Sequence, residues 1–293
     1  MKSAAFDYVR PDSLAEALAI LEARGPAARV LAGGQSLLAM MNLRLATPEL
    51  LIDIGRVPGL RGIARDGDRL RVGALVTHAA LASSAEIAAC VPLLAQAVPH
   101  VAHAAIRNAG TIGGSLALAD PAAEYPAVAL ALDARIVLAS TKGERTVAAS
   151  DYFLGLYETA MRDDELLLAT EWPCAAPGDR GAFLELARRR GDYAMVGVAA
   201  TASLRGGRVD AARIAWLSVA DRPLLTVSCA DAVVGTSLDA AAIAAARTAL
   251  AVELAPHVDR HPDAATRRHL AGVLLERALR AIAASAGADG GES

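Results

Sequence analysis

The fold is decided by the stretch Ile106-Arg107-Asn108-Ala109-Gly110-Thr111-Ile112-Gly113-Gly114-Ser115-Leu116-Ala117, which contains a glycine-rich turn predicted over 110–114. Its glycines let backbone N–H groups approach anionic oxygens, and Thr111 and Ser115 add hydroxyls that donate hydrogen bonds. Neutral donors of this kind are sufficient for the pyrophosphate of a dinucleotide. A glycine pair alone more often marks a tight turn, so a pyrophosphate site needs a second motif beside it.

The second motif is Ala32-Gly33-Gly34-Gln35-Ser36-Leu37-Leu38, directly after a buried strand predicted over 28–32. It repeats the adjacent glycines and the neighbouring hydroxyl. A Rossmann site is excluded because the third glycine of its fingerprint is missing, although Asp53 lies at a suggestive spacing. A P-loop is excluded because neither motif contains Gly-Lys-Ser/Thr. Two matching motifs therefore favour a pyrophosphate cradle of another kind.

The flanking sequence mixes helix and strand signals. Asp12 or Ser13 caps a helix that ends at Gly25-Pro26, and Glu16 completes a capping box. Before residue 173 we also expect helices over 77–89, 92–101 and 148–152, strands over 50–54, 134–139 (half-buried) and 165–172, and a hairpin over 61–74. Pro173, Pro177 and Gly178 mark a linker. Beyond it we expect strands over 183–187, 194–204 and 209–219, with a hairpin turn at 205–208, and then helices over 239–253 and 263–284.

Composition narrows the function classes. A length of 293 residues suggests about two domains. Hydrophobic residues make up 54% and aromatics only 3%, so cores must be built from Ala, Val, Leu and Ile. The net charge of −3 gives no basic footprint for nucleic acid or an anionic membrane. No apolar segment follows the start and the longest uncharged run, 87–106, is interrupted by prolines, so we expect a cytoplasmic protein without a membrane span.

The cysteines and histidines offer no metal site. Cys90, Cys174 and Cys229 are far apart in the sequence, which predicts three reduced core thiols and neither a disulfide framework nor a cluster motif. The histidines at 78, 100 and 103 do not form a ligand set with them. We therefore expect no metal on this chain.

With both glycine motifs in place, the chain resembles the FAD-binding medium subunits of molybdenum hydroxylases, the xanthine dehydrogenase superfamily. Three stretches carry the resemblance, in order along essentially the whole chain: 31–38 with 41–46, 106–117 with 119–126, and Arg189-Arg190-Gly191-Asp192-Tyr193-Ala194 running into 196–200. The second stretch is long enough to be specific.

The resemblance implies an α+β fold. Residues 1–176 would form an FAD-binding domain of the vanillyl-alcohol-oxidase (PCMH) type, with subdomains of about 1–56 and 57–176. Residues 177–286 would form a smaller α+β domain like the CO dehydrogenase flavoprotein C-terminal domain, and 287–293 a frayed tail. Docking against partner subunits is the role we expect for this C-terminal domain.

The resemblance also implies contacts to a non-covalent FAD, position by position. Those around the pyrophosphate are Leu31, Ala32, Gly33, Gly34, Gln35, Ser36, Leu37, Thr111, Ile112, Gly113, Gly114 and Ser115. Asp120 and Glu124, with Ala117 nearby, would meet ribityl or ribose hydroxyls, Leu167 would contact the flavin edge, and Tyr193 would lie near the isoalloxazine ring and gate the electron acceptor. The residues alone also allow structural roles. Asp120-Pro121 could cap a helix, and Glu124 could be a solvated carboxylate in the first turn of a helix. Tyr193 could be an aromatic side chain at a strand edge, and residues 188–190 could form a solvated or interface surface.

The function implied is that of an oxidoreductase subunit without a catalytic side chain of its own, because the flavin carries the redox chemistry. Substrate would be hydroxylated at a molybdenum cofactor on a large subunit. Electrons would then cross two iron–sulfur clusters of the 2Fe–2S type on a small subunit, reach FAD here and leave to an external acceptor such as dioxygen, a quinone, nicotinamide or a carrier protein. The expected assembly is a dimer of heterotrimers.

Two alternatives stay open. A free-standing FAD-dependent oxidoreductase of the same fold needs an acid–base residue in its own substrate pocket, and no persuasive candidate is present. A flavin- or nucleotide-binding regulatory or assembly protein needs no turnover at all. The chain also departs from many relatives by having Leu118 where they have His, and it lacks the inserted cysteine-rich loop of relatives that carry an extra cluster.

Overall fold

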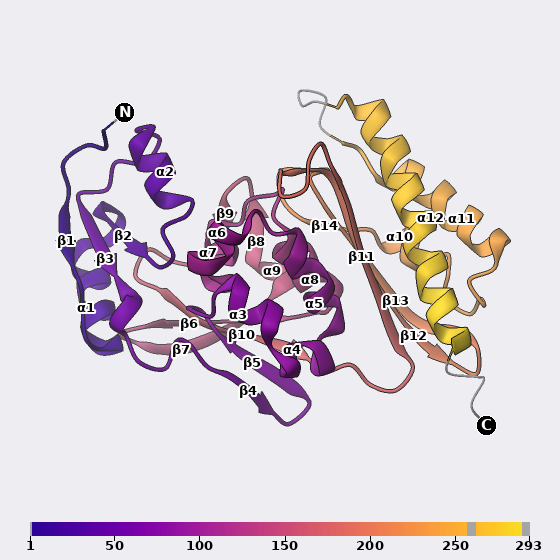
Figure 1. Cartoon of the computed structure of the whole chain (residues 1–293), viewed down its shortest axis with the longest axis horizontal. Coiled ribbons are helices and arrows are strands. Elements are labelled where there is room, and N and C mark those ends of the chain that lie inside the picture. Colours follow the sequence, from indigo (N-terminus) through magenta and orange to yellow (C-terminus); the bar gives the residue numbers. More distant parts are fainter. Residues whose placement is uncertain (1, 257–261, 289–293) are drawn as a thin grey trace.

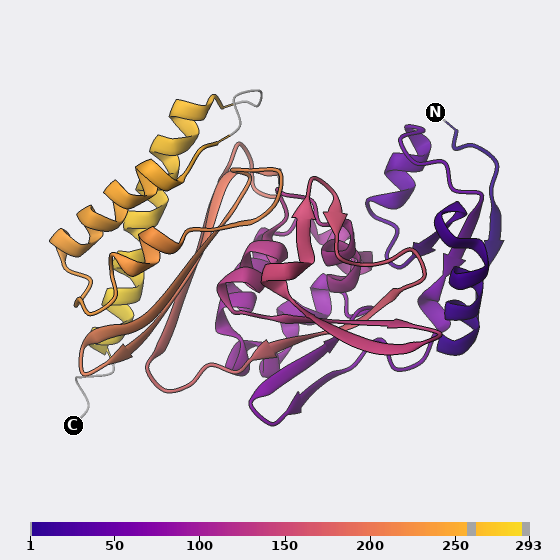
Figure 2. The ribbon, with the colours of Figure 1, turned by 180° about the vertical axis from the view of Figure 1, so that it is seen from behind.

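The computed structural model describes residues 2–256 and 262–288, and its elements form three blocks along the long axis, each built on its own β-sheet (Figure 1). A three-stranded sheet lies in the N-terminal block, a five-stranded sheet in the middle block and a four-stranded sheet in the C-terminal block. Seen from behind, the helices of the middle block lie between the five-stranded and four-stranded sheets (Figure 2).

The N-terminal block is a small parallel sheet of order β1-β3-β2 covered by one helix. Its elements are β1 (Asp7–Val9), α1 (Leu14–Arg24), η1 (Gly25–Ala27), β2 (Ala28–Leu31), α2 (Leu37–Asn42), β3 (Leu50–Asp53) and η2 (Ile54–Arg56). Helix α1 begins as predicted, because the Ser13 hydroxyl accepts the Glu16 N–H, and it ends at Gly25, whose φ is +50°. The short helix α2 was not predicted.

The middle block is an antiparallel sheet of order β4-β5-β10-β6-β7, in which β10 returns late in the sequence to the centre. Its strands are β4 (Ile63–Asp66), β5 (Arg69–Gly73), β6 (Arg135–Ser140), β7 (Gly143–Ala148) and β10 (Leu166–Pro173), beside the hairpin β8 (Phe153–Gly155) and β9 (Glu158–Thr159). Its helices are α3 (His78–Ser83), α4 (Ala85–Cys90), α5 (Pro92–Ala97), η3 (Val98–His100), α6 (Ala104–Ala109), α7 (Ile112–Leu118), α8 (Glu124–Ala131) and α9 (Ala149–Tyr152).

Several predictions of local structure in this block are wrong. The helix expected over 77–89 is broken at Ser84, which is extended (ψ 120°) and whose hydroxyl caps α4 by accepting the Ile87 N–H. The helix expected over 92–101 ends at Ala97 and continues as the 3-10 turn η3. The glycine-rich turn expected over 110–114 is instead the first turn of α7. Strand β6 is buried on both faces, because it packs between two hydrophobic clusters.

The C-terminal block is an antiparallel sheet of order β11-β12-β13-β14. Its elements are β11 (Asp179–Ala187), β12 (Ala194–Arg205), β13 (Arg208–Leu217), β14 (Leu224–Leu225), α10 (Val227–Asp231), α11 (Ala240–Glu253) and α12 (Ala264–Ala288). Helices α10, α11 and α12 cover one face, and α5 and α8 of the middle block cover the other (Figures 1 and 2). Of the predicted tail 287–293, residues 289–293 lie outside the described residues.

Polar contacts tie the middle and C-terminal blocks together. The Arg213 guanidinium donates two hydrogen bonds to the carbonyl of Leu130, at 3.0 and 2.9 Å, and the Thr201 hydroxyl donates to the carbonyl of Ala131 at 3.2 Å. One hydrophobic cluster also runs across the boundary, because Phe183, Ala199, Ala215 and Leu217 pack with the residues of α8. The two blocks therefore hold the end of α8 in a fixed place.

The expectation of three separate core thiols is wrong for two of them. Cys229 is buried, but Cys90 and Cys174 are only half-buried, and their thiols lie side by side. The backbone fixes this pairing, since the Ala175 N–H donates to the carbonyl of Cys90 at 2.8 Å. In the described part of the chain, no helix is long and apolar enough to cross a membrane.

Candidate flavin site

The two glycine motifs are in direct backbone contact. A β-carbon added at Gly33 would stand 2.1 Å from the carbonyl oxygen of Ala109 and 2.8 Å from the α-carbon of Gly110. Real β-carbons do not come this close, so only glycine lets the first motif reach the second. On the other side, a β-carbon on Gly114 would lie 4.0 Å from that of Ala32. The fold thus brings together the two stretches that the sequence singled out.

The first motif offers unused backbone donors. After β2, Gly34 has a left-handed backbone conformation with φ +71°. The Leu38 N–H donates to the carbonyl oxygen of Gly34 at 3.1 Å. No acceptor among the described residues takes the N–H groups of residues 34–37, and the Ser36 side chain makes no capping bond. Gln35 turns its amide back onto the carbonyl of Gly33 at 2.9 Å. Successive free N–H groups of this kind suit an anion.

The second motif is organised differently, because its amides already have partners. The N–H groups of Ile112 and Gly113 donate to the carbonyls of Val76 and Ala74, both at 3.0 Å, and the Gly114 N–H donates to the Thr111 hydroxyl at 3.1 Å. Gly113 is buried, and a β-carbon there would stand 2.6 Å from that of Ala74. Gly114 is exposed and Ser115 half-buried. This motif therefore offers hydroxyls and an open surface rather than free amides.

His78 supports the second motif from below. Its Nε2 would lie 2.7 Å from a β-carbon on Gly110, and its Nδ1 lies 3.0 Å from the Tyr125 hydroxyl. Burial and then the charge of Arg107 lower the pKa of His78 from 6.5 to about 4. The imidazole is therefore neutral near pH 7 and fills space beneath the motif. The sequence analysis considered this histidine only as a metal ligand and rejected that role, so its place beneath the motif was not predicted.

Asp120, Glu124 and Tyr193 gather on one side of the site. Asp120 accepts the Ala122 N–H at 2.9 Å and the Tyr157 hydroxyl at 3.4 Å, so it forms a local turn and does not cap α8, which begins at Glu124. Tyr193 is 73% exposed, and desolvation together with the charges of Asp120 and Glu124 raises its pKa. Tyr157, at the tip of the β8–β9 hairpin, is a contact that the sequence did not indicate.

The third marker lies against the loop before the second motif. Gly191, with φ +87°, packs on His103, whose Nδ1 would be 2.5 Å from a β-carbon there. The arginines at 188–190 are exposed. Leu118 is half-buried at the end of α7, and so is Ala117. Leu167 is only 3% exposed and belongs to the main hydrophobic cluster, beside a bulge of β10, so its contact with a flavin edge stays a prediction.

Two other sequence candidates lie elsewhere. The carboxylate of Asp53 accepts hydrogen bonds from Tyr8 and from the Gly55 N–H, and it pairs with Arg10 at 3.3 Å. It thus holds β1 to β3. In the described part of the chain, no three His, Cys, Asp or Glu side chains gather as a metal site would require.

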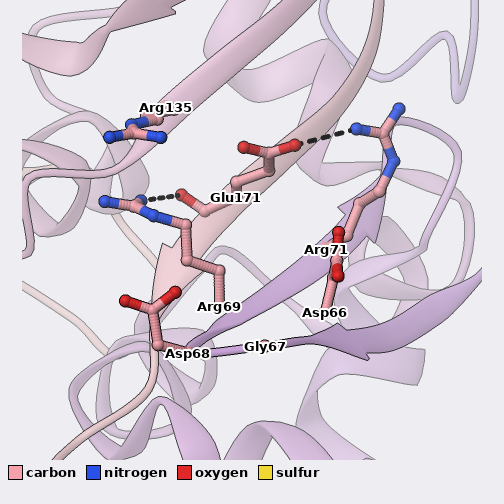
Figure 3. A pocket seen from close by; sticks show the side chains of 7 residues that line it. All are labelled: Asp66, Gly67, Asp68, Arg69, Arg71, Arg135 and Glu171. Atoms are coloured by element: carbon pink, nitrogen blue, oxygen red, sulfur yellow. Dashed lines mark hydrogen bonds and ion pairs between the residues drawn. The ribbon is translucent and has the colours of Figure 1, made fainter.

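A polar cavity of about 430 Å³ lies at the β4–β5 hairpin (Figure 3), lined by Asp66, Gly67, Asp68, Arg69, Arg71, Arg135 and Glu171. Its polar groups are partly paired internally, since Arg71 bonds the Glu171 carboxylate at 3.0 Å and Arg69 its carbonyl at 3.4 Å. None of the residues that the sequence assigned to FAD lines this cavity.

Comparison with known proteins gives matches over nearly the whole chain. Residues 4–175 match the model of the FAD binding domain in molybdopterin dehydrogenase, and residues 181–282 match that of the CO dehydrogenase flavoprotein C-terminal domain. The chain is 39% identical to the carbon monoxide dehydrogenase medium chain of Hydrogenophaga pseudoflava, over 94% of this chain and 96% of that one. It is 38% identical to the 6-hydroxypseudooxynicotine dehydrogenase complex subunit alpha of Paenarthrobacter nicotinovorans, over 95% of each.

A solved structure of carbon monoxide dehydrogenase from Hydrogenophaga pseudoflava has the same fold, with a TM-score of 0.94 and 39% sequence identity. The match covers 97% of this chain and 99% of that one. These comparisons confirm the resemblance and the α+β fold that the three motifs predicted.

Proposed function

We propose an electron-transfer role for this chain, which belongs to the family of FAD-binding medium subunits of molybdenum hydroxylases. The observation that carries the proposal is the contact between the two glycine motifs, with the free N–H groups of residues 34–37 beside the hydroxyl-bearing turn of α7. This donor set fits FAD, because a pyrophosphate needs backbone donors and close approach. No side chain at the site is arranged as a nucleophile with its base in the described part of the chain.

FAD bound here would supply the redox chemistry, which in this proposal links two iron–sulfur clusters of a partner subunit to an external acceptor. The residues of this chain bind and orient that group. The N–H groups of 34–37 would hold the pyrophosphate. The half-buried Ser115 would add a hydrogen bond, and so would the hydroxyl of the buried Thr111, which also accepts the Gly114 N–H. Asp120 and Glu124 would hydrogen-bond sugar-chain hydroxyls, and the exposed Tyr193 would gate the approach of the electron acceptor.

The partners follow from the family. We propose a large subunit with the molybdenum cofactor and a small iron–sulfur subunit, assembled as a dimer of heterotrimers. Apolar side chains are exposed on both sides of the flavin site, which supports docking there: Leu38, Leu43 and Leu45 in and after α2, and Leu154, Leu156 and Tyr157 on the β8–β9 hairpin. The C-terminal block would add a second docking surface. The cytoplasmic location stays a prediction.

The substrate is set by another subunit. Relatives of almost equal identity, 39% and 38%, are named for the oxidation of carbon monoxide and of 6-hydroxypseudooxynicotine, which share little chemistry. A flavin subunit that never contacts the substrate does not have to change when the substrate of the complex changes. We therefore propose no substrate from the residues of this chain.

The test compares reoxidation of the native complex with and without FAD. Complexes with wild-type chain and with Gly114→Leu, which fills the exposed surface of the second motif, are reduced with dithionite and desalted without oxygen. They are then mixed with dioxygen, a quinone or oxidised nicotinamide while iron–sulfur absorption is followed. We expect reoxidation to be at least tenfold slower without FAD. Equal rates with every acceptor would contradict the relay.

A further inference from the structure

Two of the three cysteines meet at the start of the linker between the middle and C-terminal blocks. Cys90 is the last residue of α4, and Cys174 is the first residue after β10. The Ala175 N–H donates to the carbonyl oxygen of Cys90 at 2.8 Å, and the Cys174 N–H donates to that of Asp68 at 2.8 Å. These two backbone hydrogen bonds fix the first residues of the linker against α4 and against the β4–β5 turn.

This backbone arrangement brings the two cysteines within reach of a disulfide. Disulfides join α-carbons up to about 6.8 Å apart. A backbone hydrogen bond from the residue after Cys174 to the carbonyl of Cys90 keeps the two α-carbons within that reach. The side chains also face each other, because the thiol of Cys174 is hydrogen-bonded to the thiol of Cys90. The S–S bond therefore requires small side-chain rotations and no movement of the main chain.

Two other roles for this pair do not fit. Both thiols are only half-buried and lie at the side of the main hydrophobic cluster, whereas Cys229 is fully buried within the C-terminal cluster. Filling the core thus explains Cys229 and not the pair. A structural metal needs about four ligands, but no third His, Cys, Asp or Glu joins the pair as a ligand in the ranges 2–256 and 262–288. Two adjacent, accessible thiols remain suited to reversible oxidation.

We propose that Cys90 and Cys174 form a reversible disulfide when the protein meets hydrogen peroxide, and that this bond ties the linker to α4. One cysteine, as its thiolate, attacks peroxide, so that an S–O bond forms, the O–O bond breaks and hydroxide leaves. The second sulfur then attacks the sulfenic acid, and the S–S bond forms as water leaves. In total, two thiols give up two electrons and two protons, and one peroxide is reduced to two waters.

The groups around the pair set the rate of this reaction. Burial, the Cys90 thiol and the charge of Asp68 raise the pKa of Cys174, and they outweigh Arg65 of β4, which lowers it. Because only the thiolate attacks, we expect cross-linking to be faster at pH 8 than at pH 7. Burial raises the pKa of the third thiol, Cys229, to about 12, so this thiol should stay reduced.

Peptide mapping of the native complex tests the proposal. The complex is treated with hydrogen peroxide at pH 8, quenched with catalase, alkylated in denaturant and cut with trypsin. Trypsin places the three cysteines in separate peptides, 72–107, 163–180 and 214–247. We expect a species in which 72–107 is joined to 163–180, which dithiothreitol separates again, while 214–247 is fully alkylated. Oxidised or unreacted Cys90 and Cys174 without the joined species would overturn the proposal.

The tie between linker and helix has its own readout. In the full chain, peroxide should raise the midpoint of thermal unfolding by at least about 4 °C, because the bond closes a long loop, and dithiothreitol should reverse this rise. Cys90→Ser and Cys174→Ser should form no joined peptide and show no rise. Cys229→Ala removes a thiol outside the pair and, as the matched control, should behave like wild type. Equal shifts in wild type and in both serine variants would overturn the tie.

This inference stands apart from the proposed function. No step of it involves FAD, an iron–sulfur cluster or a partner subunit. A complex that contains FAD but never forms the joined peptide would contradict the disulfide alone. A complex that forms the joined peptide but contains no FAD would contradict the electron-transfer role and support the disulfide.

Discussion

The α-carbon of Gly33 rests on the carbonyl oxygen of Ala109, so closely that a β-carbon at Gly33 would stand 2.1 Å from that oxygen. This contact joins the loop after β2 to the end of α6 and so links the N-terminal and middle blocks. Both partners are backbone atoms, which cannot rotate away as a flexible side chain can. The geometry of the flavin site therefore depends on a residue without a side chain at this position.

We predict that Gly33→Ala weakens FAD binding at least tenfold, which corresponds to about 1.4 kcal/mol, because the two motifs are pushed apart. Gly62→Ala is the matched control, since a β-carbon there meets no atom within 4 Å. FAD content and the dissociation constant of the purified complexes give the answer, with circular dichroism to show that both variants fold. Full FAD content in Gly33→Ala would show that the contact between the motifs is dispensable.

The adjacent glycines of the second motif should behave differently when substituted. Gly113→Ala places a β-carbon against Ala74 and should lower the free energy of unfolding by about 1–3 kcal/mol, because α7 is pushed off the loop after β5. Gly114 is exposed, and a β-carbon there closely meets only the Thr111 hydroxyl oxygen, at 3.0 Å, so Gly114→Leu should cost less stability than Gly113→Ala while FAD is lost. Urea unfolding and flavin content, measured on both variants, separate these effects. A reversed pattern would mean that Gly113, and not Gly114, faces the cofactor.

His78 should make the fold sensitive to acid. Its folded pKa of about 4 lies below the ordinary 6.5, so the unfolded chain takes up a proton first as pH falls. The neutral buried ring thus stabilises the fold above pH 6.5, and this contribution is lost between pH 6.5 and about pH 4. Between pH 7 and pH 5 we expect a loss of roughly 2 kcal/mol. Urea unfolding of His78→Gln should lack this part of the pH dependence, and an unchanged slope would place the acid sensitivity elsewhere.

The ion pair between Arg145 and Glu165 should contribute more than its surface neighbours. Glu165 has a side chain only 2% exposed and accepts from the Arg145 Nε at 2.6 Å and the Arg162 N–H at 2.8 Å. Glu165→Gln should therefore lower the free energy of unfolding by roughly 2–3 kcal/mol at pH 7. Asp164→Asn breaks the exposed pair with Lys142 and should change little.

The pH dependence of this pair has a defined sign. Burial alone would raise the pKa of Glu165, but the hydrogen bonds and charges of Arg145 and Arg162 outweigh it and lower the pKa. The stabilisation is then present above the ordinary pKa of a glutamate and is lost as pH falls through the lowered one. Thermal unfolding at pH 7 and pH 3 should differ less in Glu165→Gln than in wild type. An equal difference would assign no role to this carboxylate.

Sequence signals predicted local structure where the geometry depends only on neighbouring residues, and failed for several helices of the middle block. The capping box at Ser13 and the hairpin expected over 61–74 each depend on geometry within a few residues, and both are present. The order of strands in the middle sheet could not be read in this way. Strand β10 lies between β5 and β6 because of tertiary packing. The residues next to β10 in the sequence contain no signal for this position.

The candidate site could be predicted from the sequence only where its residues are consecutive, as they are in the two glycine motifs. The glycine pairs were visible, but the close approach of Gly113 to Ala74, which turns the expected loop into a helix, depends on a contact made in the folded chain. The contacts of Glu185 with His100 and of Cys90 with Cys174 join segments far apart in the sequence. Neither pair has a spacing that a motif could reveal.

The central claim is that this chain carries FAD within a molybdenum hydroxylase. The most direct test is the visible absorption spectrum of the protein purified gently, at low salt, from its native host. We predict the bands of a flavin overlaid with the broad, longer-wavelength absorption of iron–sulfur clusters, in a sample that also contains molybdenum. A lone chain with a pure flavin spectrum, or a colourless sample, would contradict the claim.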